Sequence, residues 1–106
     1  MITEQQWESA LQWLVDEAVN AAGARANRMQ LEKFEKVLLA KLRRQSNGKT
    51  VQEREDYALT HGEYADHLNG LRDAVEADEL FRWKKDSAQA LNDAWRTMCA
   101  NTRGLR

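Results

Sequence analysis

The sequence contains no proline and only one cysteine, Cys99, among its 106 residues. A proline inside a helix costs roughly 3 kcal/mol, so its absence permits long uninterrupted helices. A single cysteine excludes an internal disulfide and suits a reducing compartment. The longest strictly aliphatic run is Val37–Ala40, which is far shorter than the ~20 apolar residues of a membrane-spanning helix.

The first residues also lack the features of a secretory leader. Glu4 stands where such a leader carries basic residues, and no apolar stretch follows. We therefore expect a cytoplasmic protein without membrane contact. The net charge of −1 argues against a general polyanion binder. The length allows one domain at most, residues 1–106.

Three capping signals predict an all-α chain. Residues 3–6, 50–53 and 60–63 each have the form S/T-x-x-E/Q, in which side chains at both ends bind exposed backbone N–H groups. Apolar residues recur at three- and four-residue spacing after the first and third signals. We predict helices over about 3–46, 51–59 and 61–103, with a left-handed residue at Asn47 or Gly48 ending the first.

The segment Gln45–Tyr64, here called the elbow, separates two long helices of similar length. We predict that the helices fold back on each other as an antiparallel hairpin. Facing residues then include Leu42 with Tyr64, Leu38 with Leu68, and Leu11 with Trp95. In this register the small residues around Gly23 lie opposite Trp83. We expect Gly23 to make room for that large ring.

Charge and aromatic content predict self-association. Successive quarters of the chain are acidic, basic, acidic and basic, so folding back brings opposite charges together. A two-helix seam cannot bury all of the large aromatic side chains, and aromatic residues are enriched at interfaces. We therefore expect a homodimer that forms a four-helix bundle. Its predicted interface residues are Trp7, Trp13, Phe34, Phe81 and Trp95.

No pattern in the chain indicates catalysis, a cofactor or a metal. His61 and His67 stand six residues apart, which places them on different sides of a helix. They are expected to be solvated or capping residues. The acid-rich stretch 56–79 is expected to form an exposed helix face opposite the basic segment 25–45. We therefore predict a protein that is not an enzyme.

Two binding functions remain open from the residues. Lys41, Arg43, Arg44 and Lys49 gather near the elbow and could bind phosphates of single-stranded DNA. Single-strand binding usually adds exposed aromatic rings, whereas Tyr57 and Tyr64 are expected in the core. We therefore favour a protein partner at the elbow. The predicted partner-binding residues are Arg43, Arg44, Lys49, Arg54, Glu55 and Asp56.

The second half carries a resemblance to a known group of proteins. The quoted residues are 52–58, Glu63-Tyr64, His67-Leu68, Gly70-Leu71-Arg72, Ala74, Leu80, Arg82-Trp83 and Ala94-Trp95-Arg96, with Leu31-Glu32 and Phe34 in the basic helix. This pattern, within residues 21–103, resembles small helical proteins encoded by tailed bacteriophages and prophages. The resemblance implies a cytoplasmic accessory role during phage growth, near recombination and single-strand-binding genes. It implies no active site.

Overall fold

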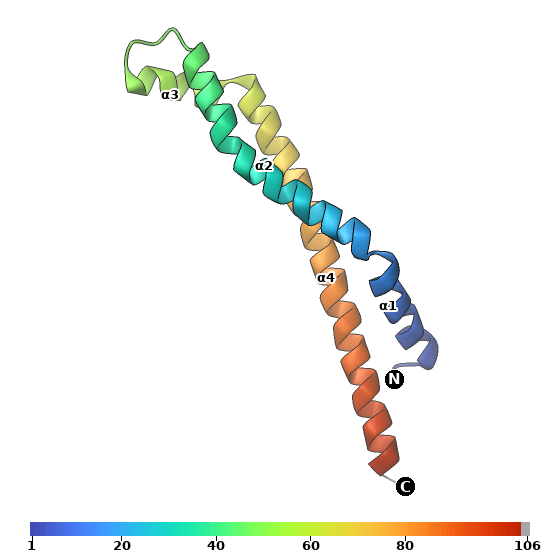
Figure 1. Cartoon of the computed structure of the whole chain (residues 1–106). Helices are drawn as coiled ribbons and strands as arrows, with labels where there is room; N and C mark the ends of the chain where they lie inside the picture. The colour runs from blue at the N-terminus through green and yellow to red at the C-terminus, as the bar shows by residue number, and fades with distance from the viewer. Residues whose placement is uncertain (105–106) are drawn as a thin grey trace. The chain divides into compact units, whose positions relative to one another are not determined.

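The computed structural model describes residues 1–104, which form four helices joined by short connections (Figure 1). In chain order these are α1 (Glu4–Asp16), α2 (Ala18–Gln45), α3 (Val51–Thr60) and α4 (Gly62–Gly104). No strand occurs within residues 1–104, so the predicted all-α class is confirmed. Within the same residues, no helix has both the length and the apolar character required to cross a membrane.

Helix α1 begins as its capping signal predicts. The Thr3 hydroxyl accepts a hydrogen bond of 3.1 Å from the Gln6 backbone N–H. The Gln6 side chain accepts one of 2.9 Å from the Thr3 backbone N–H. Both members of the capping box are therefore present, and two backbone donors that would otherwise lack an intrahelical partner are bound.

The prediction of one continuous helix over 3–46 is wrong at Glu17. Helix α1 ends at Asp16, and Glu17, which separates it from α2, has a φ of −96° and a ψ of 0°. The Glu17 backbone still donates to the Trp13 carbonyl, at 2.9 Å. Its carboxylate accepts from the Asn20 amide at 3.0 Å, which places a negative charge at the start of α2. No proline, glycine or capping box marks this interruption in the sequence.

The chain divides into two compact units, of which the first combines two separate stretches and the second is one continuous stretch. Unit 1 consists of Met1–Gly23 and Glu79–Arg106, and unit 2 consists of Ala24–Asp78. Helices α2 and α4 each contribute residues to both units.

Unit 2 has a small apolar core beside the elbow. Leu38, Leu42 and Ala58 are buried, and Leu39 and Tyr64 pack against them. Helix α3 thus contributes Ala58 to the seam between α2 and α4. Along α4 the least exposed positions follow one another at three- and four-residue spacing, the spacing of a helix seam. These positions are Tyr64, His67, Leu71, Ala74 and Asp78.

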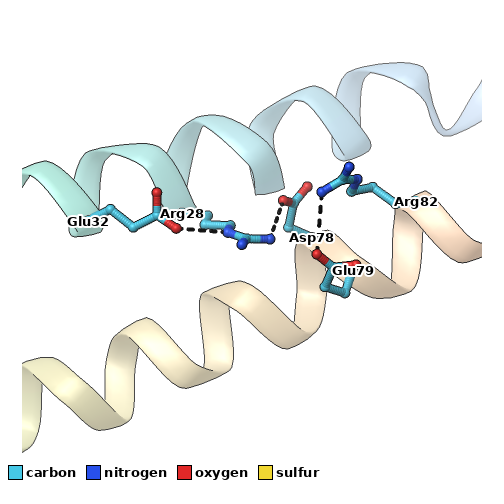
Figure 2. Close-up of polar contacts among 5 residues, drawn as sticks. All are labelled: Arg28, Glu32, Asp78, Glu79 and Arg82. Carbon is cyan, nitrogen blue, oxygen red and sulfur yellow. Dashed lines mark hydrogen bonds and ion pairs between the residues drawn. The ribbon is translucent and has the colours of Figure 1, made fainter.

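Polar contacts across this seam show that α2 and α4 run antiparallel in unit 2. The Arg28 guanidinium lies 3.1 Å from the Asp78 carboxylate, and Figure 2 shows it between Asp78 and Glu32. Further along α2 the contacts move toward the start of α4: they join Glu35 to Tyr64 at 3.0 Å and Lys41 to Glu63 at 3.3 Å. The predicted hairpin is therefore confirmed within this unit.

The predicted facing residues are correct near the elbow and partly wrong beyond it. Leu42 and Tyr64 belong to the same cluster, as predicted. Leu68, predicted opposite Leu38, is instead 43% exposed. The neighbouring His67 is buried in its place. The seam on α4 is therefore rotated toward polar positions that an apolar stripe does not include.

Unit 1 is held by an aromatic contact between α1 and α4. The Trp7 and Trp95 rings stack with 5.4 Å between their centroids and 17° between their planes. The Trp7 indole N–H donates to the Asn92 side-chain oxygen at 2.8 Å. The ring that stacks on Trp95 is thus Trp7, whereas the sequence pairing placed Leu11 opposite it. Ala88 is the buried position of α4 in this unit.

The explanation offered for Gly23 is wrong. Trp83 is 71% exposed, and no described atom outside the local helix would lie within 4 Å of a Cβ added at Gly23. The half-buried Phe81 precedes Trp83 by two residues. Two residues correspond to about 200° of rotation around a helix, so Trp83 points away from the side that Phe81 faces.

Candidate functional site

The elbow is the surface that the sequence favours for binding, and hydrogen bonds order its first loop. The predicted left-handed stop at Asn47 or Gly48 is wrong, because no residue of the described chain has a positive φ. Instead, the Ser46 N–H donates to the Arg43 carbonyl at 3.3 Å, which tightens the last turn of α2. The Ser46 hydroxyl then accepts from the Gly48 N–H at 3.0 Å.

The second capping box is only half formed. The Thr50 hydroxyl accepts from the Glu53 N–H at 3.1 Å, as predicted. The Glu53 carboxylate, however, accepts from the Lys49 N–H at 2.7 Å rather than from Thr50. The Arg54 guanidinium donates to the Gly48 carbonyl at 3.0 Å. Helix α3 therefore holds the loop through two of its side chains.

Gly48 is required by close packing in this loop. A Cβ at this position would lie 2.8 Å from the Glu53 Cβ, 3.1 Å from the Ser46 Oγ and 3.2 Å from the Arg54 backbone nitrogen. We expect Gly48→Ala to lower the free energy of unfolding by about 2 kcal/mol, because crowding of a packed site has such a cost. Chemical denaturation monitored by circular dichroism measures this change.

Gly23→Ala is the matched control. Its added methyl group meets open space in the described chain and removes a helix-interior glycine, so a gain of up to about 1 kcal/mol is expected. Equal effects of the two substitutions would contradict the crowding at Gly48.

The third capping box is wrong. Thr60 is the last residue of α3, and its hydroxyl donates to the Asp56 carbonyl at 2.7 Å. His61 has extended backbone angles, and its Nδ1 accepts from the Glu63 N–H at 3.1 Å. His61 therefore caps the start of α4, a role that the sequence allowed for it. His67 is buried, with its ring next to Phe34 and Tyr64.

Two of the six predicted partner-binding residues bind each other. The Arg43 Nε donates to one Glu55 carboxylate oxygen at 2.7 Å, and its NH2 group donates to the other at 3.1 Å. These hydrogen bonds lower the pKa of Glu55 and raise the pKa of Arg43, in each case against a smaller effect of desolvation. The pair joins the end of α2 to α3 and leaves neither charge fully available to a partner.

The Arg43–Glu55 pair predicts a stability that decreases in acid. Because the folded pKa of Glu55 is lowered, the pair's contribution is complete above its ordinary value of 4.5 and is lost as pH falls through the folded pKa. We expect the stability difference between the wild type and Glu55→Gln to shrink from about pH 7 to about pH 2. Urea denaturation across this range measures it, and a constant difference would contradict the prediction.

The other four predicted partner-binding residues divide into two kinds. Arg54 holds the Gly48 carbonyl, and Asp56 accepts a hydrogen bond of 2.8 Å from Gln52 within α3. Arg44 and Lys49 are exposed. Sequence reasoning missed two exposed apolar side chains of α3, because a single exposed residue leaves no periodic signal. These are Val51, which is 83% exposed, and Leu59, which is 46% exposed.

The same contacts bear on the nucleic-acid alternative at the elbow. Lys41 lies 3.3 Å from the Glu63 carboxylate, and Arg43 is bound by Glu55. The Tyr64 hydroxyl donates to Glu35, which raises the pKa of Tyr64 above its ordinary value. Two of the four cations proposed to bind phosphate therefore have acidic partners, while Arg44 and Lys49 keep exposed side chains.

The five predicted interface residues fall into different environments. Trp7 and Trp95 stack on each other, and Trp13 and Phe81 are half-buried. Phe34 is 45% exposed, with its ring 6.0 Å from that of His67. Trp83 is the most exposed of the four tryptophans, although the predicted register places it in the hairpin seam. Its offset from Phe81 was the signal that would have placed it outside.

No protein-family model, curated protein or solved structure matches this chain. The functional proposals below therefore rest on the residues and their surroundings.

Proposed function

We propose that this chain is a non-enzymatic, phage-type accessory protein that assembles into a helical bundle and acts by binding other proteins. The observation that carries the proposal is the exposure of Trp83, at 71%. Tryptophan is enriched at protein interfaces and contributes disproportionately to binding energy there. An indole ring exposed to water does not gain the free energy of apolar burial, and contact with a second protein surface would supply it.

Each unit also exposes other large apolar side chains, which support the proposal of a dimer interface. In unit 1, Val15 and Val19 are 73% and 81% exposed. In unit 2, Val37 and Phe34 of α2 are 60% and 45% exposed. Phe34 and Val37 are three residues apart, so they lie on one side of the helix. An antiparallel dimer would cover such surfaces as a four-helix bundle and would again place acidic segments against basic ones.

The oligomeric part of the proposal is tested by sedimentation equilibrium of the wild type and Trp83→Ala. We expect a dimer whose dissociation constant rises by about tenfold or more in the variant, as for an interface hot spot. Because Trp83 is exposed, the variant should keep its helical circular dichroism. Lys84→Ala, next in sequence and also exposed, is the control. A wild type that stays monomeric throughout would overturn this part.

The partner-binding part is tested at the elbow. Arg44→Glu with Lys49→Glu reverses two exposed charges and leaves the Arg43–Glu55 pair in place. We expect a protein captured from phage-infected cells by the wild type to be lost by this double variant. Lys84→Glu with Lys85→Glu makes the same charge change on α4 and should keep the partner. The assignment would be contradicted if the wild type captured no protein. It would also be contradicted if the wild type and the Arg44→Glu, Lys49→Glu variant captured the same protein equally.

A further inference from the structure

A groove of about 690 Å³ lies in unit 1, open to solvent. Trp7 and Trp95, whose rings stack on each other, are among the residues that line it. The other residues that matter below come from the last turns of α4, and they are Asp93, Arg96, Cys99 and Arg103. These four residues of α4 belong neither to the elbow nor to the partner-binding residues proposed there.

The stacked pair of rings is held in a fixed orientation. The Trp7 indole N–H is bound to Asn92, so this ring is fixed at its polar edge as well as by the stack. The planes of the two rings are inclined by only 17°, so the rings are nearly parallel and form a stack of two. The outer face of such a stack can accept a further flat ring. Nucleobases stack on tryptophan in this way whichever base is present.

Two guanidinium groups stand along the same groove. Arg96 and Arg103 both line it, and they are seven residues apart in α4. Seven residues are close to two helical turns, so both side chains leave the same side of the helix about 10 Å apart along its axis. Guanidinium groups bind phosphate through two parallel N–H donors. The groove thus offers a surface for a base and positions for more than one phosphate.

We propose that this groove binds single-stranded nucleic acid, with a base stacked on the Trp7–Trp95 pair and backbone phosphates held by Arg96 and Arg103. The open groove favours a strand over a free nucleotide, because small-ligand pockets enclose most of the ligand's surface. Two separated arginines likewise match consecutive phosphates of a chain. The proposal does not depend on the protein-binding function above, and it uses a different surface from the elbow.

Asp93 is the carboxylate within this lining, and it gives the proposal a directional test. It precedes Arg96 by three residues and lines the groove beside it. A negative charge there repels phosphate and offsets part of the arginine charge. Asp93→Asn should therefore tighten binding of a strand, whereas removal of the arginines should weaken it. A groove that takes no anion would show neither change.

The experiment is fluorescence anisotropy of a labelled oligothymidylate titrated with the full chain at low salt. We expect Arg96→Ala with Arg103→Ala to weaken binding by about tenfold or more, and to reduce the slope of log K against log salt by about 1.4, since each single-strand phosphate contact contributes about 0.7. The matched control is Lys84→Ala with Lys85→Ala, which removes two charges from the same helix outside the groove. Its slope should stay near that of the wild type. Circular dichroism confirms the fold of each variant.

The single cysteine supplies a readout of position. Cys99 lines the groove and is a free thiol, so a bound strand should slow its reaction with a maleimide, while thymidine monophosphate at the same nucleotide concentration should not. Absence of oligothymidylate binding at low salt would overturn the proposal. So would equal losses in the arginine and lysine variants, or an unchanged Cys99 rate at saturation. Equally tight binding of the mononucleotide would overturn the assignment to a strand.

Discussion

Replacing Arg28 with methionine is expected to lower the free energy of unfolding by about 3 kcal/mol, the effect of breaking a buried ion pair. Asp78 is only 4% exposed, and its carboxylate lies 3.1 Å from the Arg28 guanidinium. Methionine keeps much of the apolar stem but leaves the Asp78 charge in the seam without this counter-ion. Urea denaturation of the wild type and the variant measures the loss.

Two further variants separate burial from the mere loss of a charge. Arg82→Met breaks a pair with Glu79 at 3.3 Å whose side chains are 60% and 41% exposed, and it should cost at most about 1 kcal/mol. Figure 2 draws both pairs. Arg28→Met with Asp78→Leu removes both charges from the seam and should be more stable than Arg28→Met alone. Equal losses for Arg28→Met and Arg82→Met would show that burial of Asp78 has no energetic consequence.

Leu42→Ala is expected to cost about 3 kcal/mol, because it removes buried methyl groups and leaves a cavity. Leu42 is fully buried, and it packs where α2, α3 and α4 meet in unit 2. This core is small, so the loss is a large part of the 5–15 kcal/mol typical of a folded domain. Thermal and urea unfolding of the variant measure the change, and a loss of helical signal in the absence of denaturant would be an extreme form of the same result.

The control for Leu42 is Leu68→Ala. This substitution makes the same chemical change on α4, but Leu68 is 43% exposed. It should therefore lower the free energy of unfolding by no more than about 1 kcal/mol. Similar losses at the two positions would contradict the assignment of the core to Leu38, Leu42 and Ala58. The contrast also tests the seam itself, because the apolar stripe of the sequence placed Leu68 inside.

If these losses are found, the residues that stabilise unit 2 differ from those proposed to bind a partner. The seam residues Arg28, Asp78 and Leu42 hold unit 2, whereas Trp83, Arg44 and Lys49 are exposed. Substitutions in the second set therefore report on binding without a large change in the fold. This separation makes the proposed interfaces accessible to mutation, because surface substitutions seldom change stability by more than about 0.5 kcal/mol.

The sequence by itself determined the helical class, the elbow and the antiparallel return of the chain within unit 2. These follow from local signals: the absence of proline, the spacing of apolar residues, and side-chain caps such as Thr3, whose contacts span only a few residues. The end of α2 at Gln45 and the start of α3 at Val51 were located to within a residue or two for the same reason. Local chemistry also permitted His61 to cap a helix, although Thr60 was the expected choice.

Only the tertiary structure decided which helix faces meet. Asp78 and His67 are polar, and a stripe of apolar residues cannot include them, yet both are buried in the seam. Their burial depends on what lies across from them, such as Arg28 for Asp78, a contact between residues 50 positions apart. The groove beside Trp7 and Trp95 arises similarly, from residues at opposite ends of the chain. Local propensity carries no information about such partners, because their energies exist only once the helices have packed.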